Sequence, residues 1–178
     1  DATGGNVTFS GSGTLELGGT VTSLGTFTPG TSTVSYDGAS AQDIDDFGSK
    51  SGPYNNLDLD GGAEKDLTGN TTVNGILSWS ADVDMETNGH TLTIKQSPTG
   101  GNTNNRLIRG GSSSTVSVAY SSSSTNECII PVGIDGSVRD ISITAASGTA
   151  ETYTVVYTPG SPGTINWNTT PTGVAINP

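Results

Sequence analysis

The feature that most constrains this chain is the close spacing of its turn-forming residues. No segment of ten or more residues places apolar side chains at positions i, i+3, i+4 and i+7 without an interrupting Gly or Pro. This pattern predicts no helix. Asn-Gly and Asp-Gly pairs favour the positive φ angles of tight reversals. The turn signals are Gly18-Gly19, Pro29-Gly30, Asp37-Gly38, Asp60-Gly61-Gly62, Asn74-Gly75, Asn88-Gly89, Asp135-Gly136 and Pro159-Gly160.

Short runs of β-branched and apolar residues lie between the turns. Residues 91–94 and 140–143 alternate apolar with Thr, Ser or Asp, which places one set of side chains inward and the other toward solvent. We therefore predict an all-β fold, a β-sandwich or jelly-roll-like arrangement of short strands with Gly, Pro and Asn turns. The expected strands are 6–10, 14–17, 33–36, 56–59, 71–74, 76–79, 90–95, 115–120, 128–132, 140–144, 152–157 and 164–167.

A weak internal repeat supports an alternative fold. Segments 13–19, 56–62, 75–79 and 90–94 each place alternating residues beside Gly. Over the later copies the spacing is roughly 15 to 20 residues, which both solenoid coils and successive hairpins produce. The alternative is a β-solenoid first half followed by a small sandwich.

The charge distribution divides the chain. The net charge is −11, and residues 1–100 hold 13 of the 17 Asp and Glu residues but only 3 of the 6 basic ones. We expect an acidic β-strand-repeat region at 1–96, a Gly, Ser and Asn-rich loop or linker at 97–114, and a second β region at 115–178. With so few basic residues, a nucleic-acid partner is excluded, because binding phosphates needs clustered Lys and Arg.

The inventory of reactive side chains argues against catalysis. The chain has one Cys and one His, which rules out zinc clusters and most pairs of nucleophile and base. Cys128 lies in an apolar strand pattern, so we expect it in the core. His90 follows the predicted turn at Asn88-Gly89. No stretch has the length of a membrane-spanning helix. We expect no enzyme, no membrane span and no cofactor.

Calcium is the one cofactor that the sequence raises. Asn56, Asp58 and Asp60 match the start of a calcium loop, but the twelfth position is Leu67 where a bidentate Glu belongs. The acidic sets 82, 84, 86 and 43, 45, 46 raise the same question. Any of these acids can also form a glycosidase pair if two carboxylates lie at the required separation. Solvent-facing acids on strands are the simpler interpretation.

Aromatic and lysine residues carry two further hypotheses. Trp79 and Trp167 are candidates for a platform on which a sugar ring stacks, although core packing explains such residues as well. Lys50, Lys65 and Lys95 are the candidates for a covalent link to Asn or Asp, but their polar neighbours suggest exposed side chains.

Four stretches of the first half have similar strand-like sequence patterns: 25–44, 54–59, 65–77 and 87–94, with Thr-Leu-Thr-Ile at 91–94 as an example. They resemble the β-strand repeats of large secreted adhesin-like proteins of Bacteroidetes-type bacteria. Segments 130–133, 141–143 and 153–157 are similar to what often follows those repeats. The resemblance implies an exported surface or matrix protein of a bacterium without a catalytic centre, and it assigns no functional residue.

Both ends of the chain contain a short apolar strand pattern beside a turn-prone segment. The strand at Asn6, Val7, Thr8 and Phe9, or the one holding Val174 and Ile176, can add to the sheet edge of another molecule. We therefore predict an extracellular structural or adhesive subunit that self-associates by β-strand addition into a filament or surface layer. The alternative is a non-catalytic carbohydrate-binding module of a secreted protein, with glycans or other cells as partners.

Overall fold

The computed structural model describes residues 5–46, 53–101, 106, 108–110, 116–122, 126–134, 137–144 and 151–157. These residues form strands and no helix, so the all-β prediction is confirmed, and none of them belongs to a helix that is long and apolar enough to cross a membrane. The strands are β1 Asn6–Thr8, β2 Thr14–Glu16, β3 Thr26–Thr28, β4 Thr33–Tyr36, β5 Gln42–Ile44, β6 Asn56–Leu59, β7 Lys65–Leu67, β8 Thr71–Val73, β9 Leu77–Trp79, β10 Met85–Glu86, β11 Thr91–Ile94, β12 Ile108–Arg109, β13 Val116–Ser122, β14 Cys128–Ile134, β15 Ser137–Ile143 and β16 Glu151–Tyr157.

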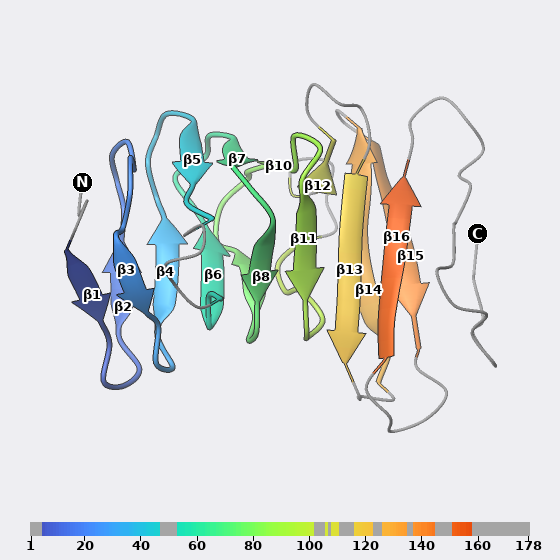
Figure 1. Cartoon of the computed structure of the whole chain (residues 1–178). Helices are drawn as coiled ribbons and strands as arrows, with labels where there is room; N and C mark the ends of the chain where they lie inside the picture. Colours follow the sequence, from blue (N-terminus) through green and yellow to red (C-terminus); the bar gives the residue numbers. More distant parts are fainter. Residues whose placement is uncertain are drawn as a thin grey trace.

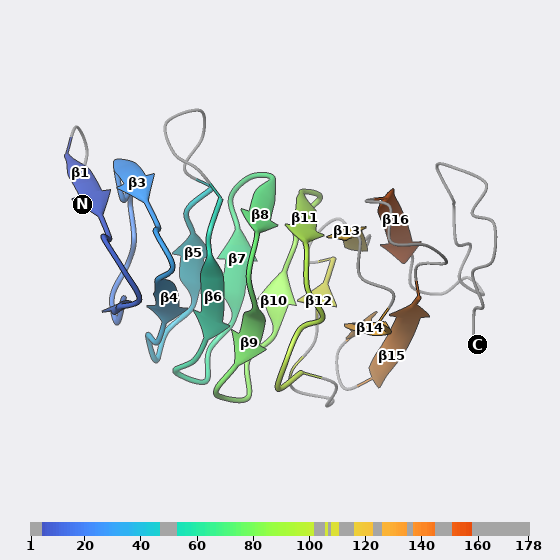
Figure 2. The ribbon, with the colours of Figure 1, turned by 90° about the horizontal axis from the view of Figure 1, so that it is seen from below.

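The chain winds as a three-sided coil whose strands stack in parallel from left to right in Figure 1. The first side carries β1 and β3 and, farther along, β8, β11 and β13. The second side carries β2, β4, β6 and β9, and the third carries β5, β7, β10, β12 and β14. Figure 2 shows the same stack from below. The fold is therefore β-solenoid-like, as the alternative prediction has it for the first half, and not a jelly-roll sandwich.

The strand register gives the length of a coil. On the second side Leu15 pairs with Val34, Val34 with Leu57 and Leu57 with Leu77, so successive coils take 19, 23 and 20 residues. The sandwich was the wrong choice because alternation of apolar and polar residues is common to half-buried antiparallel sheets and to solenoid sides. The two folds differ in which strands pair: here a strand of the second side pairs with the strand one coil away, and not with its neighbour across a hairpin.

The C-terminal end of the stack changes to antiparallel pairing. β15 pairs with β14, and β16 pairs with β13, over seven residues each. The predicted linker at 97–114 does not interrupt the third side, because β12 lies within it and pairs with both β10 and β14. The short strands β3, β5, β7, β10 and β12 were not predicted, and the predicted strand 164–167 lies outside the described residues.

Stacked apolar side chains fill the inside of the coil. On the second side Val34, Leu57 and Leu77 lie one above another, each with at most 1% of its surface exposed. Cys128 is also fully buried, as predicted. Burial raises the pKa of its thiol to about 12, so Cys128 packs as a small apolar residue.

Lys65 corrects the sequence analysis, because its side chain is 0% exposed and lies inside the coil. It pairs in register with Gln42 on one side and Met85 on the other, so it belongs to the inward row of the third side. Its Nζ donates to the carbonyl oxygen of Gly38 at 2.9 Å. Gln42 Nε2 donates to the carbonyl oxygens of Leu17 and Gly19, both at 2.6 Å. These polar side chains therefore satisfy backbone carbonyls that the coil corners turn inward.

The turn at residues 60–62 stacks directly on the turn of the preceding coil. Gly61 has a φ of 79°, and a Cβ atom there would lie 2.3 Å from the carbonyl oxygen of Asp37. Gly62 has a similar φ of 76°, but a Cβ atom there meets nothing within 4 Å. The two neighbours thus differ in steric contact and share the same backbone strain.

This pair gives a test of the coil stacking. We expect Gly62→Ala to lower the free energy of unfolding by roughly 1–2 kcal/mol, the cost of a left-handed conformation with a side chain. Gly61→Ala is expected to cost clearly more, since its methyl group also pushes two coils apart. Urea unfolding followed by circular dichroism measures both. Equal losses in the two variants would contradict the stacked turn.

Candidate functional site

The most concentrated group of charged side chains lies on the outer surface of the third side. Asp43, Asp66, Glu86 and Arg109 occupy the same outward position on β5, β7, β10 and β12, because Asp43 pairs with Asp66, Asp66 with Glu86 and Glu86 with Arg109. Each of these strands is so short that its outward residue is flanked by corner turns. The parallel register therefore brings together residues that are 20 to 23 positions apart in sequence.

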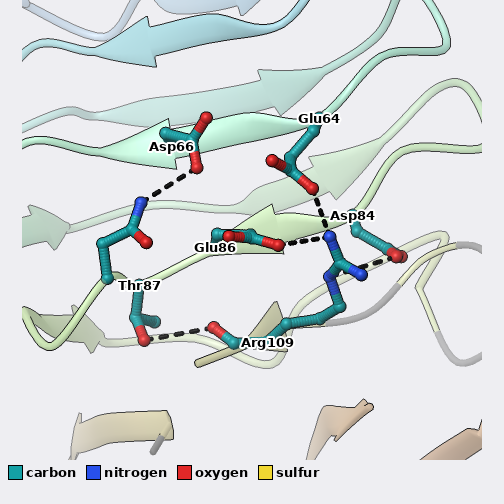
Figure 3. A network of polar contacts seen from close by, with 7 residues as sticks. Glu64, Asp66, Asp84, Glu86, Thr87 and Arg109 are labelled. Carbon is teal, nitrogen blue, oxygen red and sulfur yellow. Dashed lines mark hydrogen bonds and ion pairs between the residues drawn. The ribbon is translucent and has the colours of Figure 1, made fainter. Parts of the chain in front are cut away.

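Arg109 is the centre of this group, which Figure 3 shows from close by. Its Nη2 contacts carboxylate oxygens of both Glu64 and Glu86, and its Nε lies 3.3 Å from Oδ2 of Asp84. The carbonyl oxygen of Arg109 accepts hydrogen bonds from the backbone N–H of Thr87 at 2.8 Å and from its hydroxyl at 3.1 Å. One guanidinium thus joins β12 to three carboxylates on the two preceding coils. We call Glu64, Asp66, Asp84, Glu86 and Arg109 the charged cluster.

Asp66 completes the cluster on its far side. Its Oδ1 accepts a 2.9 Å hydrogen bond from Nδ2 of Asn88, which follows β10 in the left-handed conformation with φ of 50°. That conformation is favoured in an Asn-Gly turn, so the predicted turn at Asn88-Gly89 is confirmed. Burial raises the pKa of Asp66, while the hydrogen bond from Asn88 opposes the rise. The turn therefore holds a donor over the carboxylate of Asp66.

Glu86 has a strongly perturbed carboxyl group. Its side chain is 15% exposed. Burial and the neighbouring carboxyl of Glu64 raise its pKa to about 7, against the attraction of Arg109. One positive charge among four acids leaves repulsion that a proton on Glu86 relieves. The cluster consequently binds a proton near neutral pH.

A metal ion would compete with Arg109 at this place. Carboxylate oxygens of Glu64, Asp66 and Glu86 lie within 4.8 Å of one another, which is close enough for one hard cation to bridge them. The guanidinium of Arg109 already contacts carboxylate oxygens of Glu64 and Glu86. Among the residues that the structure describes, no other set of three acidic, His or Cys side chains lies this close.

A hollow of about 340 Å³ opens beside the cluster and is lined by Gly62, Glu64, Asp82, Val83 and Asp84. Asp82 is paired with Arg106 at 2.7 Å. Glu86, whose raised pKa would suit a general acid, is not part of the lining. The raised-pKa carboxyl of Glu86 therefore does not line this hollow, whereas a glycosidase places its general acid in the open cleft.

The predicted calcium residues do not converge. The carboxylate of Asp58 accepts hydroxyl hydrogen bonds from Ser35 at 3.0 Å and from Ser78 at 2.6 Å, on the coils before and after it. Asn56 Oδ1 accepts from the backbone N–H of Ile76, and Asp60 Oδ1 from that of Gly61. Asp58 and Asn56 thus bond to neighbouring coils and Asp60 bonds to its own turn. The extended strand spaces the three residues along one outer face instead of wrapping them around an ion.

The other predicted site residues fall in three places. Trp79 is 4% exposed and packs inside the coil, where Gly101 covers its ring, so it presents no open face to a sugar. Asn6, Val7 and Thr8 form β1 at the N-terminal end of the stack, and Phe9 packs edge-on against Phe27 with ring centroids 6.1 Å apart. Trp167, Val174 and Ile176 lie outside the described residues.

The sequence analysis did not identify Glu64 and Arg109, and it grouped Glu86 only with its sequence neighbours. The available signal was the interval between outward residues at 43, 66, 86 and 109, which matches the coil length. No protein-family model, curated protein or solved structure matches this chain. The resemblance to adhesin-like repeats thus stays a prediction from the sequence.

The raised pKa of Glu86 predicts how stability depends on pH. The folded state holds this proton up to about pH 7, whereas an unperturbed Glu releases it at 4.5. Between these values the folded protein binds more protons than the unfolded chain, so its stability falls as the pH rises. We expect Glu86→Gln to flatten this part of the stability curve, measured by urea unfolding from pH 4.5 to 8.

Asp43→Asn provides the matched control, because it removes an exposed carboxylate from the same outward row without touching Arg109. We expect this variant to keep the wild-type slope between pH 4.5 and 7. A Glu86→Gln protein with the unchanged wild-type slope would show that Glu86 does not carry the proton.

Proposed function

We propose that this protein is an extracellular structural or adhesive subunit that assembles by β-strand addition through the N-terminal end of its coil. The observation that carries the proposal is a pair of open strand edges, β1 on the first side and β2 on the second. Each has one neighbour, β3 and β4 respectively, and no other described strand lies against its outer edge. The placement outside the cell rests on the resemblance to adhesin-like repeats.

The backbone of β1 leaves hydrogen-bonding groups at its open edge. The carbonyl oxygen of Gly5 and the N–H of Phe9 bond to β3. Because the direction alternates along a strand, the N–H and C=O groups of Asn6 and Thr8 point away from β3. In β2 the same argument applies, since Gly13 and Leu17 bond to β4. Thr14 and Glu16 therefore present their backbone groups outward, as a template for another strand.

The apolar residues of the first coil are less completely covered than those farther along. Val7, Phe9, Leu15, Leu17 and Val21 are only partly buried. Their counterparts in the next coil, such as Phe27 and Val34, are 1% exposed. Covering the first coil would thus remove apolar surface from water, at roughly 25 cal/mol for each Å². This gain adds to the backbone hydrogen bonds of an added strand.

The two edges are short and carry no Lys or Pro. Natural edge strands are commonly guarded by Lys or Pro. β1 reads Asn-Val-Thr and β2 reads Thr-Leu-Glu, so Glu16 is their one charged residue. We take the absence of Lys and Pro from these two strands as support for edges that function in assembly. A contact of this kind, combined with a second contact elsewhere on the subunit, extends into a filament or surface layer.

Proline substitution at the open edge tests the proposal. Thr8→Pro combined with Thr14→Pro removes two outward N–H groups, and neither is needed for the bonds to β3 and β4. We expect the full chain to associate with rising concentration, seen by light scattering and negative-stain microscopy, and the double proline variant to stay monomeric.

Thr8→Ser combined with Thr14→Ser is the matched control, since it changes the same side chains and keeps both N–H groups. It should associate as the wild type does, and circular dichroism should show that all three proteins fold. A wild-type chain that remains monomeric at every concentration, or a proline variant that associates normally, would refute assembly through these edges.

A further inference from the structure

We infer that the partner at the N-terminal end is a second copy of this chain, joined about a twofold axis so that β1 of each copy runs antiparallel to β2 of the other. The inference rests on the proposed function and names its partner. It follows from the way the two open edges match each other in length, direction and side-chain chemistry.

The first coil has strands on two of its three sides. β1 lies on the first side and β2 on the second, whereas residues 17–25, which complete the coil, contain no strand. A twofold axis that passes through the strandless side exchanges the other two sides. It therefore sets β1 opposite β2 of the second copy and, by symmetry, β2 opposite β1. Both open edges are paired by one operation.

The directions of the strands agree with this arrangement. Every coil of one copy runs in the same sense around the stack, since β1 to β14 pair in parallel. Turning a second copy end over end reverses that sense. Strands that meet across the two N-terminal ends are thus antiparallel, which is the geometry in which facing residues exchange both backbone hydrogen bonds.

The register that pairs outward backbone groups also pairs compatible side chains. It sets Thr8 opposite Thr14 of the second copy, and Asn6 opposite Glu16 of the second copy. All of these residues direct their N–H and C=O groups to the open edge, as argued above from the bonds of Gly5, Phe9, Gly13 and Leu17. An amide opposite a carboxylate can donate to it, and the two Thr form a favourable cross-strand pair.

The same register covers apolar surface and keeps acids apart. Val7 comes opposite Leu15 of the second copy, and both are partly buried side chains that face the inside of the coil. Glu16 does not meet Glu16. Pairing β2 with β2 about a different axis would set β1 against the strandless residues 17–25. The exchange of β1 with β2 is therefore the arrangement that uses both edges.

Head-to-tail stacking is the competing arrangement. At the C-terminal end the outermost strands are β15 and β16, which are seven residues long and antiparallel to their neighbours. β1 and β2 are three residues long and match each other in length. The two arrangements predict different neighbours for Thr8 and Thr14, so a covalent probe at these positions separates them.

The test mixes two single-cysteine variants of the full chain, Thr8→Cys and Thr14→Cys. Facing residues of an antiparallel pair lie about 5.5 Å apart at Cα, within the range of a disulfide. Native Cys128 is fully buried and does not compete. After mild oxidation we expect a covalent dimer containing one chain of each kind in the mixture, and essentially none in either variant alone. Intact mass spectrometry reads the composition, and reducing agent should restore monomers.

The possible outcomes separate this inference from the proposed function. Covalent dimers in each variant alone, or no disulfide in a mixture that still associates, would overturn the twofold pairing and leave assembly through the open edges in place. Mixtures that neither associate nor cross-link would contradict both. Adding Thr14→Pro to the Thr8→Cys chain serves as the internal control, since it should abolish the mixed disulfide.

Discussion

The structure depends on one constraint: a single coil of this chain cannot bury its own apolar side chains. Each inward residue is covered by the residue at the same position one coil away, as in the row of Leu15, Val34, Leu57 and Leu77. Stability in such a stack comes from contacts between nearest neighbours. Among the described strands, β1 and β2 each pair on one edge only, so the partial exposure of the apolar side chains in the first coil follows from their position.

The same stacking creates the charged cluster and explains its limits. Parallel register places outward residues of successive coils side by side, and on the third side those residues are acidic until Arg109. Arg109 joins β12 to β10 and to Glu64, the residue before β7, just before the pairing becomes antiparallel at β14 and β15. We therefore interpret the cluster as a set of ion pairs that holds the coils together near this change from parallel to antiparallel pairing. Glu86 titrates near neutral pH because its carboxyl lies in a poorly hydrated site with three other acids and one arginine.

The sequence was sufficient for features that depend on neighbouring residues. The turn at Asn88-Gly89, the strands at 33–36 and 56–59 and the buried Cys128 could all be predicted from local pattern. Pairing partners could not, because alternation does not encode which strand lies alongside. Lys65 shows the difficulty: the period of two in β7 puts it inward with Leu67, but a charged side chain is expected outside. Its interior acceptor, the carbonyl of Gly38, exists only once the coils are stacked.

The central claim is that β1 and β2 pair with the stack on one edge and are open on the other. Amide hydrogen exchange, measured by NMR on a dilute sample of the full chain, tests it most directly. The account predicts alternation in β1 and β2, with slow exchange at Val7 and Leu15 and fast exchange at Thr8 and Thr14. The amides of β6, which has neighbours on both sides, should all exchange slowly. Uniform exchange along β1 and β2, whether fast or slow, would contradict the claim that these strands pair on one edge and are open on the other.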